Sequence, residues 1–238
     1  MRVYKSVSMK YVLSFLLIWL WAGTTLSAQL VEDAIEAPDM EEIQTQINDP
    51  SSPLYYPALM KRYLDNDTTL NLAEYRCLYL GYSFQEDYNP YRVVEHTDRL
   101  KELYARSDYD EFVCDSIIKY ARLAIDDFPF DLRQMNMLVY AYRSKGDKVQ
   151  EALWGYKLKS IVDAILSTGD GQTRESAWYV IYPAHEYDII NRLGLTVTSY
   201  VFEEPYYDHL KVDTNPFKVE GYYFNVSRIL TVFEQKYK

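Results

Sequence analysis

Apolar side chains recur every three or four positions along most of the chain between Pro38 and Leu166. This spacing places them on one face of a helix, and the polar breaks between the periodic stretches indicate turns. The segment 81–91 has no such spacing and is predicted to be a loop. Helices are predicted to begin near Pro38 and within residues 51–64, and then to cover residues 72–80, 92–106, 109–127, 131–145 and 148–166.

Several of these helices carry end signals. Asn71 is followed three positions later by Glu74, which is typical of a capping box, where each side chain accepts from the other residue's backbone N–H. Asp108 is placed to cap the helix predicted from residue 109, and Gly146 suits the left-handed position after the helix over 131–145. Pro38 suits a first helical position.

Part of the helical region resembles a tetratricopeptide repeat. Leu138, Tyr142 and Gly146 lie 9, 13 and 17 positions after Pro129, and these offsets are similar to those of that helix pair. The spacing recurs about 60 residues earlier, from Tyr75, which is no multiple of the roughly 34-residue period. Two interpretations stay open: helical hairpins packed in the tetratricopeptide manner without a regular array, or an unrelated helical bundle.

The composition changes at residues 167–176 (STGDGQTRES), which contain two glycines and no large apolar residue. Beyond this break, β-branched and aromatic residues dominate several short segments, as in half-buried strands. Strands are predicted over 177–182, 195–207, 207–212 and 217–227, where Gly221 suggests a bulge. A short helix is predicted over His185–Leu193, ended by Gly194, and a helix or frayed strand over 228–238.

The expected fold is therefore mainly α with a C-terminal α+β part. Residues 29–168 are expected to form tetratricopeptide-like helical hairpins. Residues 169–238 are expected to form a small, mostly antiparallel sheet of three or four strands with one or two helices.

Residues 1–28 have the layout of a secretory signal peptide. Arg2, Lys5 and Lys10 precede an apolar run of eleven residues (Tyr11–Trp21), and small residues lead to the sequence LSA at 26–28. Eleven apolar residues are too few to span a bilayer. We therefore expect residues 1–28 to be removed and the chain to be exported to the periplasm, or further to the extracellular space. A retained membrane anchor is the alternative.

The remaining chain is strongly acidic. Residues 1–28 hold three of the 25 basic residues and none of the 35 acidic ones, which leaves 22 against 35, a net charge of −13. Such a surface repels phosphate backbones and anionic lipids, so we expect no nucleic-acid partner and no stable membrane span after signal removal. A hydrophobic content of 48% and 25 tyrosines favour a folded chain over a disordered one.

Cys77 and Cys114 are the only cysteines. Export permits a disulfide between them, whereas their apolar, helical surroundings suit free and buried thiols. The chain has no CxxC pair, no Cys/His spacing typical of zinc sites, no phosphate-binding Gly-rich loop and no serine-hydrolase elbow. We expect no metal and no cofactor.

Three long segments resemble a known family. Residues 55–91 (YYPALMKRYLDNDTTLNLAEYRCLYLGYSFQEDYNPY), 169–195 (GDGQTRESAWYVIYPAHEYDIINRLGL) and 215–227 (NPFKVEGYYFNVS) are similar to signature blocks of an exported domain-of-unknown-function family, number 4919. Its members occur mainly in gut-type Gram-negative bacteria. The resemblance covers most of the chain beyond residue 28 and implies export to the periplasm or beyond. It assigns no catalytic role to any residue.

The sequence HEYD at residues 185–188 brings a histidine, two acids and a tyrosine together in a chain with three histidines. If Pro183 opens a helix, Glu186 and Asp188 lie in the first turn, where carboxylates stabilise the positive end of the helix. We interpret the cluster mainly as a helix start. The functional alternative is a polar contact at the junction with the helical region.

Helical spacing makes Tyr187, Ile190 and Leu193 the expected buried stripe of this short helix. His185 and Glu186 are adjacent and point about 100° apart, so they do not suit one metal ion as a pair spaced by four would.

Nine tyrosines and phenylalanines crowd residues 55–91. A tyrosine offers a large apolar face and a polar tip, which suits both cores and binding surfaces. We expect most of them to pack between helices and those of the loop to be the exceptions. The candidate binding residues are therefore Tyr82, Phe84, Tyr88 and Tyr91, with Arg62 and Arg76 among them in sequence, and His185 and Glu186.

Two function classes follow. The first is an exported, non-enzymatic binding or protein-interaction module of the cell envelope, with a protein or glycan partner. The alternative is a periplasmic hydrolase acting on glycan or peptide, with acids and His185 meeting in a cleft between the two regions. Catalytic carboxylates need to be close only in space, so the sequence identifies no catalytic residue.

Overall fold

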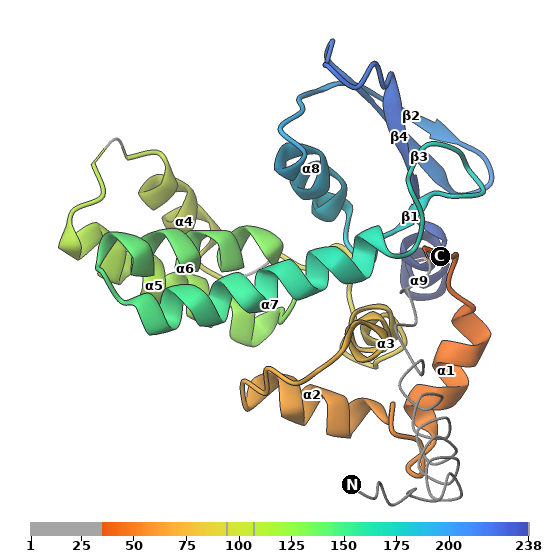
Figure 1. Ribbon diagram of the computed structural model, residues 1–238, viewed down its shortest axis with the longest axis horizontal. Coiled ribbons are helices and arrows are strands. Elements are labelled where there is room, and N and C mark those ends of the chain that lie inside the picture. Colours follow the sequence, from red (N-terminus) through yellow and green to blue (C-terminus); the bar gives the residue numbers. More distant parts are fainter. Residues whose placement is uncertain (1–34, 94, 107, 238) are drawn as a thin grey trace, which may run out of the picture. The chain divides into compact units, whose positions relative to one another are not determined.

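The computed structural model describes residues 35–93, 95–106 and 108–237 (Figure 1). The predicted signal peptide lies outside these residues. The helices are α1 (Met40–Asn48), α2 (Tyr56–Leu64), α3 (Leu72–Tyr82), α4 (Thr97–Tyr104), α5 (Glu111–Asp127), α6 (Leu132–Ser144), α7 (Lys148–Leu166), α8 (Pro183–Arg192) and α9 (Ser227–Tyr237). The strands are β1 (Trp178–Tyr179), β2 (Val197–Glu203), β3 (Tyr207–Val212) and β4 (Gly221–Asn225). The prediction of a mainly α chain with a C-terminal sheet is confirmed.

Helix starts follow the local cap signals, with two shifts. The capping box of α3 is present, since Asn71 Oδ1 accepts from the Glu74 N–H at 2.9 Å and Glu74 Oε2 accepts from the Asn71 N–H at 2.8 Å. The cap of α5 is Asp110, so the prediction of Asp108 was wrong by two residues. Asp39 caps α1, which leaves Pro38 outside the helix.

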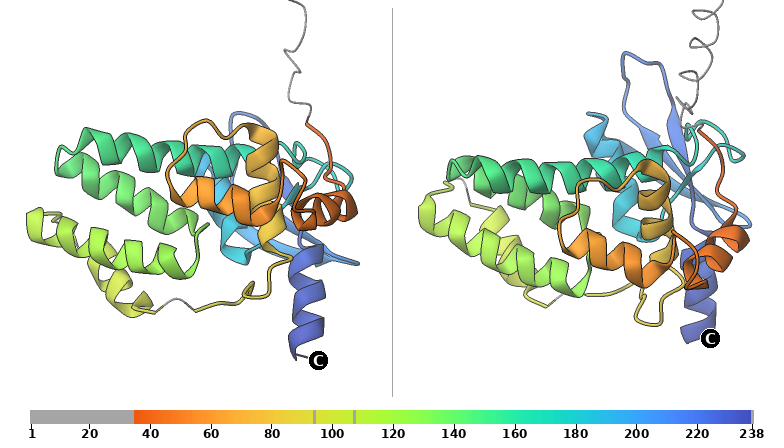
Figure 2. Two further views of the ribbon diagram at one scale, coloured as in Figure 1. Left: turned by 90° about the horizontal axis from the view of Figure 1, so that it is seen from below. Right: turned by 60° about the horizontal axis from the view of Figure 1, so that its bottom comes forward.

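The helices α5, α6 and α7 pack as consecutive neighbours, and α3 packs against α7 (Figures 1 and 2). Gly146 adopts a positive φ of 73° directly after the α6 C-cap, as its sequence position predicts. Within the described residues, no helix combines the length and apolarity needed to cross a membrane.

The sheet is mixed, with strand order β1-β4-β3-β2. The pairs β2–β3 and β3–β4 are antiparallel, whereas β1 pairs parallel to β4. The strand predicted over 177–182 shortens to β1 because the Ile181 N–H donates to the Tyr79 hydroxyl, outside the sheet, before α8 begins. The register irregularity lies in β2, between Val197 and Ser199, and not at Gly221.

The described residues form two hydrophobic core clusters, a small one between α4, α5 and α6 and a large one that joins the helices to the sheet. The large cluster contains residues from α1 through α9, and its largest fully buried side chains include Tyr63, Tyr75, Tyr79, Phe130 and Phe224. Tyrosine thus supplies much of the core volume, and most buried hydroxyls in folded proteins have a hydrogen-bond partner.

Cys77 in α3 and Cys114 in α5 are free and buried. Burial raises the pKa of the Cys77 thiol to about 11 and raises the pKa of the Cys114 thiol above its ordinary value. Both thiols therefore stay protonated at neutral pH, which makes them poor nucleophiles.

We predict that a thiol titration of denatured, non-reduced protein finds two free thiols per chain. The folded protein should react far more slowly with the same disulfide reagent, because both sulfurs are buried and protonated. Fewer than two thiols in denaturant would contradict the structure.

Candidate functional site

The loop aromatics do not form one exposed surface. Tyr82 ends α3 and is 3% exposed, and Tyr88 is 1% exposed with its hydroxyl donating to Ile181 O at 2.6 Å. Phe84 is half-buried, whereas Tyr91 is 45% exposed. The expectation that all four are solvent-facing was wrong, because residues 81–91 fold back onto the core.

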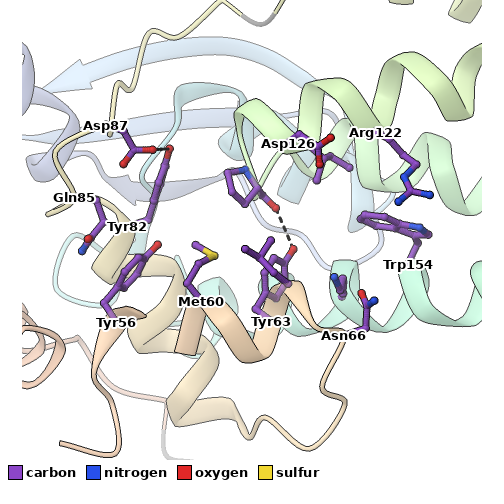
Figure 3. A pocket seen from close by; sticks show the side chains of 14 residues that line it. Tyr56, Met60, Tyr63, Asn66, Tyr82, Gln85, Asp87, Arg122, Asp126 and Trp154 are labelled. Carbon is purple, nitrogen blue, oxygen red and sulfur yellow. Dashed lines mark hydrogen bonds between the residues drawn. The ribbon is translucent and has the colours of Figure 1, made fainter. Parts of the chain in front are cut away.

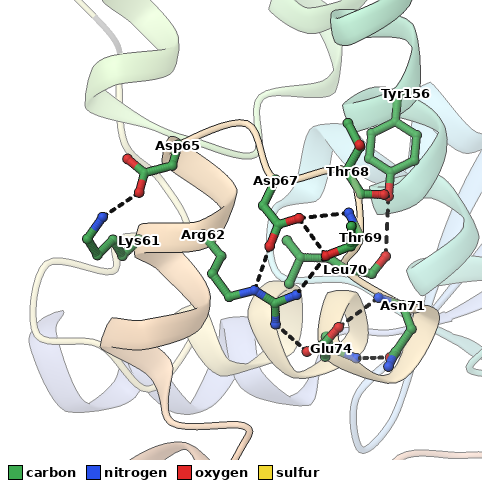
Figure 4. Close-up of polar contacts among 10 residues, drawn as sticks. All are labelled: Lys61, Arg62, Asp65, Asp67, Thr68, Thr69, Leu70, Asn71, Glu74 and Tyr156. Atoms are coloured by element: carbon green, nitrogen blue, oxygen red, sulfur yellow. Dashed lines mark hydrogen bonds and ion pairs between the residues drawn. The ribbon is translucent and has the colours of Figure 1, made fainter.

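The two arginines hold elements together. Arg62 of α2 pairs with Asp67 (Nε to Oδ2, 2.7 Å) and with Glu74 of the α3 capping box (Figure 4). Arg76 of α3 donates from Nη1 to Ser167 O at 2.7 Å, at the end of α7. Their charges and donors are used in these structural contacts.

His185 lies in the core and not at a solvated helix end, with 1% of its surface exposed. Its Nε2 is 2.9 Å from Phe130 O and its Nδ1 is 2.8 Å from the Tyr79 hydroxyl. A carbonyl oxygen only accepts, so Nε2 carries the proton and Nδ1 accepts from Tyr79. Burial lowers the pKa of His185 to about 3, which keeps the ring neutral.

The buried face of α8 differs from the predicted one. Tyr187 and Leu193 are 44% and 37% exposed, while His185 and Glu186 are buried together with Ile189 and Ile190. The predicted stripe is confirmed at Ile190 and was wrong at Tyr187 and Leu193, because the apolar spacing ignored polar side chains. Tyr79 and Phe130 supply the hydrogen bonds that allow His185 to be buried.

His185 faces the helical core, whereas Glu186, the next residue of α8, points toward the sheet. Glu186 lines a cavity of about 310 Å³ with Asp208 of β3, which we call the carboxyl pocket. The Glu186 and Asp208 carboxyl groups lie close enough to shift each other's pKa, and the Tyr200 hydroxyl donates to Asp208 Oδ1 at 3.0 Å. The other residues that line the carboxyl pocket are Tyr91, Pro183, Tyr187, Tyr200, Phe202, Val226, Ile229 and Leu230.

Burial and the neighbouring Asp208 raise the pKa of Glu186 well above its ordinary value. Burial also raises the pKa of Asp208, against the hydrogen bond from Tyr200 that lowers it. Two buried carboxyl groups beside each other favour holding one proton between them over carrying two negative charges.

A second cavity, of about 500 Å³, lies between the helices α2, α3, α5 and α7 (Figure 3). We call it the lysine pocket, after Lys157 of α7. Tyr56 and Trp154 line it toward opposite ends (Figure 3). Its other lining residues are Met60, Tyr63, Leu64, Asn66, Tyr82, Gln85, Asp87, Arg122, Ile125, Asp126 and Pro129.

Lys157 is 5% exposed. Its Nζ lies 4.4 Å from the centre of the Tyr63 ring and 5.2 Å from that of Trp154. Within the described part of the chain, no carboxylate forms an ion pair with it. Burial, and secondarily the positive charge of Arg122, lower the pKa of Lys157 to about 8.

Two polar atoms of the lysine pocket residues are buried without a partner among the described residues: the Tyr56 hydroxyl and Trp154 Nε1. The third such atom is Glu186 Oε1, at the carboxyl pocket. Unpaired buried polar atoms are rare in folded proteins, and here all three belong to residues that line a cavity.

The sequence interpretation missed Lys157, Trp154 and Asp208, although each carries a signal. Lys157 lies in the apolar stripe of α7, three residues after Trp154 and four before Ile161, where a charged residue is unusual. Asp208 lies two and four positions before Leu210 and Val212, so it shares the buried face of β3 with these apolar residues.

The chain belongs to a family described only as a domain of unknown function, DUF4919, whose model matches residues 41–235. No curated protein and no solved structure matches the chain. Within the described residues, no group of three or more His, Cys, Asp or Glu side chains is arranged to hold a metal ion.

The Tyr79→Phe variant should lose about 2 kcal/mol or more of unfolding free energy, measured by urea denaturation. It leaves His185 Nδ1 and the Ile181 N–H without their partner, and each unpaired buried group costs about 1–3 kcal/mol. The control is Tyr140→Phe, at a tyrosine 44% exposed, with an expected change within about 0.5 kcal/mol. Equal stability of the two variants would contradict the assigned hydrogen bonds.

Proposed function

We propose that this chain is an exported, non-catalytic binding module of the cell envelope whose ligand is a glycan that carries an acidic group. The observation that carries this proposal is Lys157, a buried cation without a carboxylate partner, in the lining of the lysine pocket. We also propose that its helical hairpins pack in the tetratricopeptide manner.

A buried ammonium without an anion is costly to the fold. Interactions with the faces of Tyr63 and Trp154 offset part of the desolvation, but neither ring supplies an opposite charge. An anion entering the lysine pocket would supply both the opposite charge and the acceptor. Groups kept at a cost to stability are typical of binding sites.

Three other polar groups of the lysine pocket support the same ligand chemistry, and the carboxylates of Asp87 and Asp126 in its lining restrict the acidic group to the end near Lys157 and Arg122. The Tyr56 hydroxyl and Trp154 Nε1 are unpartnered and able to donate, and Arg122 adds a second positive charge at the lining. A sugar acid offers many oxygen acceptors for such donors. The aromatic faces supply apolar packing, and a few polar groups among aromatic walls are the usual makeup of ligand pockets.

Export is proposed from the sequence of residues 1–28, which has a basic start, a short apolar run and small residues before position 29. An envelope ligand fits an exported chain. We propose the periplasm as its location, with the extracellular space as the alternative.

The hydrolase alternative needs His185 and acids around one cleft. Glu186 lines the carboxyl pocket, whereas His185 lines neither pocket and uses both ring nitrogens in the core. We therefore propose binding as the function.

Glucuronate should bind the protein at pH 7 with a dissociation constant of about 1 mM or below, measured by isothermal titration calorimetry. Glucose and glucosamine, which lack the carboxylate, should bind at least about tenfold more weakly. The Lys157→Met variant should lose at least about tenfold in glucuronate affinity, because one charge-assisted contact is removed.

Lys157→Met should be as stable as the wild type or more stable, since replacing an uncompensated buried charge by an apolar side chain removes a desolvation cost. The matched control is Lys159→Met on the same helix, where the lysine side chain is 71% exposed and pairs with Asp163. Lys159→Met should bind glucuronate normally. Equal affinity for glucuronate and glucose, or unchanged binding by Lys157→Met, would refute the proposal.

A further inference from the structure

The floor of the carboxyl pocket carries a negative charge in a place with little water. Glu186 is 2% exposed and Asp208 is 8% exposed. Their shared proton leaves one charge on the pair, and the Tyr200 hydroxyl favours that charge on Asp208 by donating to Oδ1 at 3.0 Å.

No positive group compensates this charge from within the pocket. None of the described residues that line the carboxyl pocket is basic. In addition, Glu186 Oε1 is a buried acceptor that receives no hydrogen bond. The floor therefore has both an uncompensated charge and an unused acceptor, and a ligand with N–H donors and a positive charge would satisfy the two together.

The walls of the carboxyl pocket are aromatic. Tyr200 and Phe202 are two residues apart on β2 and so project from the same face of this edge strand. Tyr187 of α8 and Tyr91 of the loop complete the walls, and all four side chains are between 42% and 51% exposed. Half-exposed aromatic faces attract organic cations through their negative π faces.

We infer that the carboxyl pocket is a second ligand site, which takes a primary amine attached to an apolar or aromatic body. The ammonium meets Glu186 Oε1 and the Asp208 carboxylate, and the body packs between Tyr187, Tyr200 and Phe202. The cavity of about 310 Å³ limits this body to the size of one side chain or small ring. This inference goes beyond the proposed function and does not depend on the lysine pocket.

An amine is favoured over a neutral sugar because of the charge on the floor. A neutral hydroxyl would give the orphaned acceptor a hydrogen bond but would leave the negative charge of the pair uncompensated. A carboxylate ligand would add a second negative charge beside the first.

The test uses three probes of matched shape, titrated calorimetrically into the purified protein at pH 7 and low salt. Phenethylamine carries the ammonium, 2-phenylethanol is its neutral analogue and 3-phenylpropionate its anionic one. We expect phenethylamine to bind with a dissociation constant of about 1 mM or below, and the other two at least about tenfold more weakly.

Asp208→Asn should weaken phenethylamine binding by at least about tenfold, because it removes the charge from the floor. Phe202→Ala, on the exposed edge strand, should weaken it severalfold and serves as the second variant if Asp208→Asn alters the fold. Glu204→Gln removes one acid from the same β2–β3 hairpin outside the carboxyl pocket and should leave binding unchanged. Equal binding of amine and alcohol, no saturable amine binding, or unaltered binding by both pocket variants would overturn the inference.

Discussion

The turn between α5 and α6 is held on two sides by buried hydrogen bonds, and both pockets depend on it. On one side His185 Nε2 donates to Phe130 O at 2.9 Å, and on the other the Tyr63 hydroxyl donates to Pro129 O at 3.0 Å. Because an unpaired buried carbonyl costs about 1–3 kcal/mol, these two donors tie α8 and α2 to the same turn. The Phe130 ring packs 5.6 Å from Tyr63 and 6.0 Å from Tyr79, which fills the space between them.

Each of these two hydrogen bonds also positions a residue of one pocket. The Tyr63 ring that is oriented by Pro129 O lies under the ammonium of Lys157. His185, fixed by Phe130 O, precedes Glu186, and adjacent helical side chains diverge by about 100°. Burying His185 on the core side of α8 therefore turns Glu186 toward Asp208 and the sheet. The orientation of α8 therefore places neutral His185 in the core and Glu186 at the carboxyl pocket.

Much of the fold follows from local signals in the sequence. The Asn71–Glu74 capping box, the left-handed Gly146 and the start of α8 at Pro183 depend on residues close in sequence. The length of β1 could not be predicted, because it is set by the Tyr79 hydroxyl about a hundred residues away. The residues that line the two pockets were predictable only in part, because contacts between residues far apart in sequence also place them. Tyr82, Tyr91 and Glu186 do line pockets, but the long-range contacts that bury Tyr82 and Tyr88 leave no local pattern.

The most direct test of the account is the pKa of Lys157, followed by NMR of its side-chain ammonium with and without saturating glucuronate. In the free protein, burial should hold the pKa of Lys157 at about 8, below the ordinary value of a lysine. An anion bound beside the ammonium favours its charged form, so glucuronate should raise the pKa of Lys157. The same pKa of Lys157 in the free and glucuronate-saturated protein would contradict the account.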